Sequence, residues 1–88
     1  MNLTTKTIRL SQHAKQQCRY RGTNEDEICQ AIRTSAWGKA ELNRLECRKD
    51  FLFEKEWNGK YFKTKQVRPI FIEERNEIFV VTVYVYYF

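Results

Sequence analysis

Few side chains in this 88-residue sequence could do chemistry. Its only histidine, His13, can exchange a proton near pH 7. Arg21 can hold a phosphate through two parallel hydrogen bonds, and nearby Arg19 adds a second cation. Thr82 and Tyr84 carry hydroxyl groups that can donate to a phosphate oxygen or a ribose 2′-hydroxyl. Together these types suit RNA cleavage without a metal, because the 2′-hydroxyl is the nucleophile and the enzyme supplies proton transfer and cations.

Each of these residues also has a structural explanation. A histidine near a helix N-terminus is often an ordinary surface residue, and arginines at a helix C-terminus complement the helix dipole. A tyrosine in an aromatic strand often fills the sheet. The sequence has no glycine-rich phosphate loop, no nucleophile elbow and no HExxH motif. From composition and spacing alone, a generic basic binding domain explains the sequence as well as a nuclease does.

Positive charge is concentrated in two windows. The sequence has 16 Lys and Arg against 11 Asp and Glu, for a net charge of +5. Residues 1–24 and residues 57–72 contain no acidic residue. The cations that we predict to bind RNA are Lys15, Arg19, Lys60, Lys63, Lys65 and Arg68. A positive field of this kind favours anionic partners, nucleic acid first.

The three cysteines, Cys18, Cys29 and Cys47, are odd in number and widely spaced. They form no CxxC pair, and with one histidine they do not provide the four clustered ligands of a zinc site. A metal or redox protein built on them is the weakest hypothesis. We expect reduced thiols in a cytoplasmic protein, with no metal and no cofactor. No apolar signal region or membrane-length apolar run is present, so we expect no membrane association.

The first half of the sequence has helical periodicity. Ser11 can cap a helix over residues 11–21, and Gly22 can end it. Asn24 can cap a second helix over residues 25–34, whose acidic first turn suits the helix dipole. The second half changes to a period of two, which is typical of strands.

Tight turns divide the second half into strands. Asn58-Gly59 is the strongest hairpin signal, with a returning strand over residues 61–66. Pro69 cannot donate to a ladder and indicates an edge or a bulge in a strand over residues 67–73. We expect the last strand, residues 78–88, to lie inside the sheet, since both of its faces are apolar or aromatic.

Regular alternation along the last strand predicts which side chains share a face. The face toward the helices is expected to carry Phe79, Val81, Val83, Val85 and Tyr87. The opposite face is expected to carry Ile78, Val80, Thr82, Tyr84 and Tyr86. We predict a single α+β domain over residues 1–88, in which two N-terminal helices pack on a twisted, mainly antiparallel sheet of about four strands.

Several short motifs occur in an order that resembles a known family. They are Leu10-Ser11-Gln12-His13-Ala14, Arg21-Gly22, Glu25-Asp26-Glu27-Ile28, Ala31-Ile32 and Val80-Val81-Thr82-Val83-Tyr84. With these motifs the chain resembles the small prokaryotic family known as domain of unknown function 4258, which is grouped with the RelE and barnase-like ribonuclease toxins. The resemblance covers nearly the whole chain. It implies a RelE-like fold, with a helix pair followed by a twisted antiparallel sheet.

The resemblance also implies a site that joins the first helix to the last strand. By position, His13 is the general acid or base, Arg21 the phosphate ligand, and Thr82 and Tyr84 the orienting hydroxyl groups. The family has Arg one helical turn after the histidine, where this chain has Gln17, so the phosphate clamp loses a cation. Toxins of this class have antitoxins, which implies an acidic, antitoxin-like protein partner.

Two hypotheses follow from the sequence. The first is a metal-independent RNA-cleaving or RNA-binding domain of the toxin-like class, with RNA as its partner. The second is a non-catalytic protein-interaction module on the same fold. Its binding face or homodimer interface would be the aromatic last strand, because an exposed strand of this composition otherwise promotes aggregation.

Overall fold

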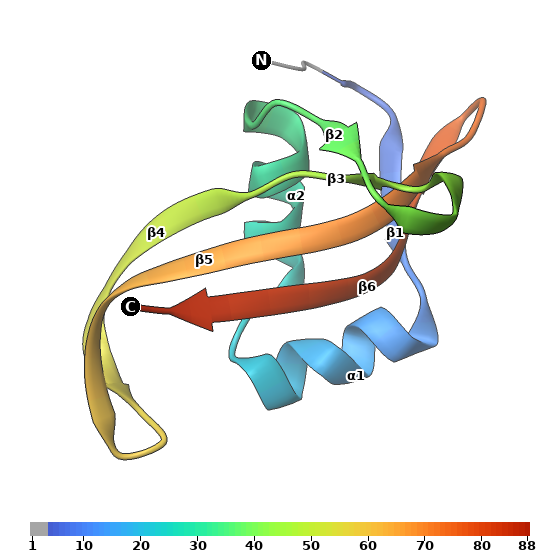
Figure 1. The fold of residues 1–88 in the computed structure, drawn as a ribbon. Helices are drawn as coiled ribbons and strands as arrows, with labels where there is room; N and C mark the ends of the chain where they lie inside the picture. The colour runs from blue at the N-terminus through green and yellow to red at the C-terminus, as the bar shows by residue number, and fades with distance from the viewer. Residues whose placement is uncertain (1–3) are drawn as a thin grey trace.

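The computed structural model describes residues 4–88, and a strand comes before the helices (Figure 1). The elements are, in order, β1 (Thr7–Leu10), α1 (Gln12–Arg21), α2 (Glu25–Thr34), β2 (Gly38–Lys39), the short 3₁₀ turn η1 (Glu41–Asn43), β3 (Leu45–Glu46), β4 (Lys49–Trp57), β5 (Lys60–Glu73) and β6 (Glu77–Tyr87). Over residues 4–88 the fold is α+β with a six-stranded mixed sheet. The prediction of a RelE-like fold, with two N-terminal helices on a mainly antiparallel sheet of about four strands, is therefore wrong.

The last strand lies between the first strand and β5. The strand order is β1-β6-β5-β3-β2, and β4 also pairs with β5. β1 runs parallel to β6, with Thr7 opposite Glu77, whereas the other pairs are antiparallel. The prediction that the last strand lies inside the sheet is confirmed. The parallel neighbour was not predicted, because β1 is only four residues long.

Both helices contribute to one core behind the sheet (Figure 1). α1 packs against β6 and α2 against β5. The fully buried core side chains come from both helices and both long strands; they are Ala14, Ile28, Ala31, Ile32, Val67, Phe71, Ile78, Val80 and Val83. No helix within residues 4–88 is long and apolar enough to cross a membrane.

The predicted helix ends are confirmed. The Ser11 hydroxyl accepts a hydrogen bond from the backbone N–H of Ala14, and Asn24 caps α2 through the N–H of Glu27. Gly22 ends α1 in the left-handed conformation, with φ of 79°. Its left-handed backbone turns the chain sharply between the two helices, which glycine does without a steric cost.

A β-bulge in β6 breaks the regular alternation. Ile70 opposes Thr82 but Phe71 opposes Val80, so two steps of β6 match one step of β5 at Val81. The extra residue puts Ile78 and Val80 on the same side as Val83, in the helix-facing core. The predicted faces of the last strand are therefore wrong before the bulge and right after it.

The predicted hairpin at Asn58-Gly59 is confirmed. Both residues have positive φ, 52° and 79°, as a type I′ turn requires. On the side of β5 away from β6, β4 pairs with β5 as far as Val67, and β3 pairs with it from Ile70. Pro69 lies between these two positions. Its missing N–H therefore falls in a gap between two ladders.

The hairpin of β4 and β5 bends sharply at its far end (Figure 1), and the Trp57 ring lies next to Gly22 at the junction of the helices. The rings of Phe53, Trp57 and Phe62 lie around Tyr87, with ring centroids 5.1, 5.1 and 5.7 Å from that of Tyr87. The Tyr87 hydroxyl donates a hydrogen bond to the carbonyl of Arg21. These contacts fix the C-terminal end of α1, from which Arg21 extends.

Candidate nucleic-acid interface

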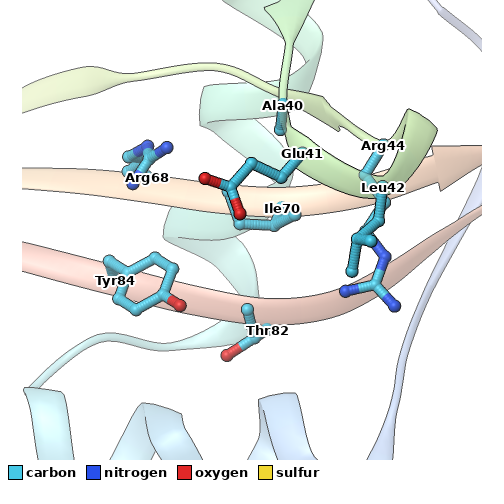
Figure 2. A pocket seen from close by; sticks show the side chains of 8 residues that line it. All are labelled: Ala40, Glu41, Leu42, Arg44, Arg68, Ile70, Thr82 and Tyr84. Carbon is cyan, nitrogen blue, oxygen red and sulfur yellow. The ribbon is translucent and has the colours of Figure 1, made fainter.

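The face of the sheet opposite the helices carries a pocket of about 330 Å³ (Figure 2). A loop from β2 to β3 forms one wall, and β5 and β6 form the floor. The lining residues are Ala40, Glu41, Leu42, Arg44, Arg68, Ile70, Thr82 and Tyr84. In Figure 2 the Glu41 carboxylate and the Arg44 guanidinium both extend from the loop over the strands.

The loop over the pocket is compact but locally strained. The N–H of Ala40 donates to the carbonyl of Arg44 at 2.8 Å, and the N–H of Arg44 donates to the carbonyl of Glu41 at 3.2 Å. Leu42 and Asn43 each have φ of 60°. The left-handed conformation is unfavourable for leucine. The strain accompanies a turn that presents Glu41 and Arg44 on one side of the loop.

Two arginines from different elements approach the ring of Tyr84. The guanidinium carbons of Arg21 and Arg68 are 5.3 and 5.5 Å from the centroid of its ring. Arg21 reaches the ring from the end of α1, and its Nε donates to the Gln17 side-chain oxygen at 2.7 Å. Gln17 therefore orients Arg21, whereas an arginine at this position would have added a second positive charge. Arg21 has no ion pair within residues 4–88, which leaves its charge uncompensated there.

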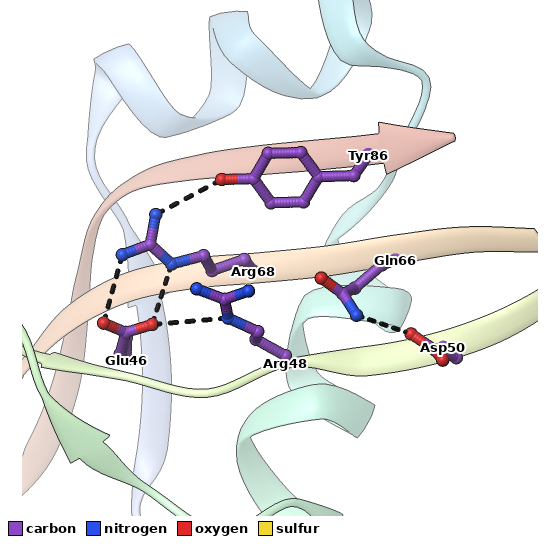
Figure 3. Close-up of polar contacts among 6 residues, drawn as sticks. All are labelled: Glu46, Arg48, Asp50, Gln66, Arg68 and Tyr86. Atoms are coloured by element: carbon purple, nitrogen blue, oxygen red, sulfur yellow. Dashed lines mark hydrogen bonds and ion pairs between the residues drawn. The ribbon is translucent and has the colours of Figure 1, made fainter. Parts of the chain in front are cut away.

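Arg68 is held in a fixed orientation on the open face (Figure 3). Its Nε and Nη2 donate to the two carboxylate oxygens of Glu46 at 2.8 and 3.0 Å, and its Nη1 donates to the Tyr86 hydroxyl at 3.3 Å. Arg48 approaches the same carboxylate at 3.6 Å. The hydrogen bonds from Arg68 lower the pKa of Glu46. Because two arginines share one carboxylate, the group keeps a net positive charge.

The structure brings together three of the four predicted catalytic residues. Thr82 and Tyr84 line the pocket, and Arg21 contacts the Tyr84 ring. His13 does not line the pocket. It is exposed in the first turn of α1, and its side chain makes no hydrogen bond or ion pair to the rest of residues 4–88.

The predicted RNA-binding cations lie in different places. Lys15 and Arg19 are exposed on α1, Lys60 and Lys63 are exposed on the hairpin, and Arg68 lines the pocket.

Lys65 differs from the other cations because it is only 8% exposed. Its Nζ lies 2.8 Å from a carboxylate oxygen of Glu27 and donates to the carbonyl of Gly22 at 3.0 Å. Lys65 therefore attaches the hairpin to the helices and is not part of the exposed basic surface.

Sequence reasoning missed Glu41, Arg44 and Glu46. They lie in or beside the β2–β3 loop, where the sequence has no helical or strand periodicity to indicate which side chains face the sheet. The only signal was the high density of charged residues between 41 and 50 around the turn-forming Asn43.

The three cysteines are free thiols, and burial raises the pKa of each. For the buried Cys47 the pKa rises to about 12. Within residues 4–88 no three His, Cys, Asp or Glu side chains gather in a group that could hold a metal. The thiols therefore remain protonated near neutral pH, as structural cysteines do.

The chain matches no family model, no curated protein and no solved structure. The resemblance to domain of unknown function 4258 therefore stays a prediction that depends on short motifs.

Proposed function

We propose that this protein binds RNA on the open face of its sheet and cleaves it at the pocket without a metal ion. The proposal depends most on one observation: the guanidinium groups of Arg21 and Arg68 both approach the Tyr84 ring, and Arg44 lines the same pocket. Guanidinium groups bind phosphate through paired hydrogen bonds, and an aromatic ring can stack an unpaired base. Cations, hydroxyl groups and a carboxylate thus line one pocket of about 330 Å³.

The pocket also suggests how the cleavage would proceed. Arg44 and Arg68 would hold the phosphate, and the Thr82 and Tyr84 hydroxyls would orient it. Glu41 would take the proton of the 2′-hydroxyl, whose oxygen then attacks phosphorus. The bond from phosphorus to the 5′-oxygen breaks, and that oxygen takes a proton from water. The products are a 2′,3′-cyclic phosphate and a free 5′-hydroxyl. This assigns the base to Glu41 in place of His13, because Glu41 lines the pocket.

The test is cleavage of a mixed-sequence fluorescent RNA in EDTA between pH 5 and 9. We expect Glu41→Gln to reduce the rate by about 10²-fold or more, the usual contribution of a general base. Glu56→Gln, at an exposed carboxylate of the hairpin, is the matched control. Loss of cleavage in His13→Ala with full activity in Glu41→Gln would return the role to His13. Salt-sensitive RNA binding without cleavage by the native protein would leave a binding domain only.

Exposed apolar side chains favour a second candidate, a protein-interaction module. Leu52 is 74% exposed and Phe88 is 58% exposed. Both oppose Thr64 of β5, so they lie on either side of it in the sheet. Apolar groups grouped in this way often mark an interface. Concentration-dependent sedimentation would test a homodimer, and Leu52→Lys should abolish it if this surface is the contact.

The remaining predictions concern partners and location. An acidic, antitoxin-like protein would be attracted to the uncompensated Arg21 and to the Arg48, Arg68 and Glu46 group. It would therefore compete with RNA for the same face. We propose a cytoplasmic location, because the three cysteines are free. A pull-down with an acidic protein should weaken as salt is raised and as RNA is added.

A further inference from the structure

Three aromatic side chains form a row along the open face of β6 and the residue that follows it. Tyr84, Tyr86 and Phe88 alternate with Val85 and Tyr87, which turn toward the helices. The row is accessible to solvent, with exposures of 37%, 40% and 58%. Alternate residues of a strand are spaced by about 6.6 Å. The open face therefore carries aromatic rings at a regular spacing, beginning at the pocket.

A row of polar side chains on β5 runs beside the aromatic row. Arg68 opposes Tyr84, and Gln66 opposes Tyr86. Thr64 exchanges both backbone hydrogen bonds with Phe88, so it opposes the third ring. Figure 3 shows the Tyr86 ring lying along its strand next to Arg68 and Gln66. Each ring thus has a neighbour that can hydrogen-bond to the edge of a molecule stacked on the ring.

From these two rows we infer that the face binds single-stranded nucleic acid, with one base on each of Tyr84, Tyr86 and Phe88. The inference rests on the proposed function and extends it to a three-nucleotide footprint along β6. Bases in a duplex are separated by about 3.4 Å along a strand, half of the spacing of the rings. Only an unpaired strand with its bases separated can place successive bases on this row.

The polar row favours nucleotides over a second copy of the chain. Arg68 is hydrogen-bonded to Glu46, and Gln66 Nε2 donates to Asp50 Oδ1 at 2.9 Å. A dry protein interface across the rings would bury these charged groups, which is unfavourable. Nucleotides leave them hydrated, and the phosphates gain Arg21 at the Tyr84 end of the row. Charge and chemistry therefore both fit a strand of RNA.

Binding is measured by fluorescence anisotropy with a labelled 2′-O-methyl oligouridine, which cannot be cleaved through its 2′-oxygen. We expect it to bind at least tenfold more tightly than a duplex of the same length. Tyr86→Ala and Phe88→Ala should each weaken binding roughly tenfold, the effect of losing one stacked base. Tyr86→Phe keeps the ring without its hydroxyl and should recover most of the affinity that Tyr86→Ala loses. Tyr20→Ala, at an exposed tyrosine of α1, is the control and should change nothing.

Several results would overturn the inference. Native affinity in both Tyr86→Ala and Phe88→Ala would refute it while leaving RNA binding at the pocket intact. Equal affinity for the duplex would do the same. If the native protein binds no oligonucleotide, the proposed function fails as well. If these variants change only the sedimentation of the protein, the row is a contact with a second copy. Tyr86→Leu, which keeps apolar bulk, guards against a loss of affinity through unfolding.

Discussion

Replacement of Gly22 by alanine should destabilise the protein through two separate effects. The residue has φ of 79°, where a Cβ atom costs roughly 1–2 kcal/mol. A Cβ at this position would also lie 2.8 Å from two ring carbons of Trp57 and still closer to the Tyr87 hydroxyl. Overpacking of this kind costs about 1–3 kcal/mol. We therefore expect Gly22→Ala to lower the free energy of unfolding by about 2–5 kcal/mol.

Gly59 provides the matched control for this experiment. It also has φ of 79°, but a Cβ there would meet nothing within 4 Å. Gly59→Ala should therefore cost only the backbone contribution, about 1–2 kcal/mol. The loss of unfolded-state entropy is the same for both substitutions and cancels in their difference. That difference, about 1–3 kcal/mol, measures how tightly the hairpin packs on the end of α1.

The assay is urea denaturation, with the melting temperature as a second measurement. In a domain of this size each kcal/mol lowers Tm by about 4–8 °C. Combining Gly22→Ala with Tyr87→Phe removes the hydroxyl that the Cβ would meet and should recover part of the loss relative to Tyr87→Phe alone. Equal destabilisation by Gly22→Ala and Gly59→Ala would refute the packing argument. It would mean that the hairpin does not rest against Gly22 in solution.

Three further predictions concern charge and burial. Lys65→Met should cost about 1–3 kcal/mol in urea denaturation, because the partly buried Glu27 loses its cation and keeps only the hydrogen bond from Thr23; Lys65→Met combined with Glu27→Gln should cost less. Arg68 lowers the pKa of Glu46 in the folded state, so its contribution to stability is present above pH 4.5 and is lost as pH falls through the lowered value. The free energy of unfolding of Glu46→Gln should consequently fall less steeply below pH 4.5, and an unchanged slope would contradict this. Cys47, with its pKa raised to about 12, should resist alkylation at pH 8 until the protein unfolds, whereas rapid reaction in the native state would show that the thiol is accessible.

Local signals in the sequence predicted the local structure well. Ser11, Asn24 and Gly22 define the helix ends because a cap depends on one side chain or one backbone angle. The Asn58-Gly59 turn was predictable for the same reason. The length and apolar character of the last strand indicated its interior position, which its pairing with β1 and β5 confirms.

Features that depend on distant pairing were not predictable. β1 is a short strand, and among residues 4–88 its only ladder partner is β6, at the other end of the sequence. The bulge at Val81 lies among apolar residues, so a shift of one position leaves the hydrophobic pattern unchanged. The wrong faces predicted for Ile78 and Val80 follow from this.

The candidate site was predicted in part. Arg21 and Tyr84 come from opposite ends of the chain and lie in contact, whereas His13 lies outside the pocket. The loop that supplies Glu41 and Arg44 has no periodic pattern, so nothing in the sequence placed it over β5. The charge of Lys65 could not be distinguished from that of a surface lysine, because the ion pair with Glu27 forms only in the folded chain.

The position of β6 between β1 and β5 has a consequence for synthesis and folding. The strand that joins the two sides of the sheet is the last of the six to leave the ribosome. Until it emerges, β1 has no neighbour and the helices have only part of the surface that they cover. Topologies with such distant contacts fold slowly, because the loop must close before the contacts form. Nascent chains of this protein should therefore be sensitive to proteases until β6 has been released, and should then become resistant in one step.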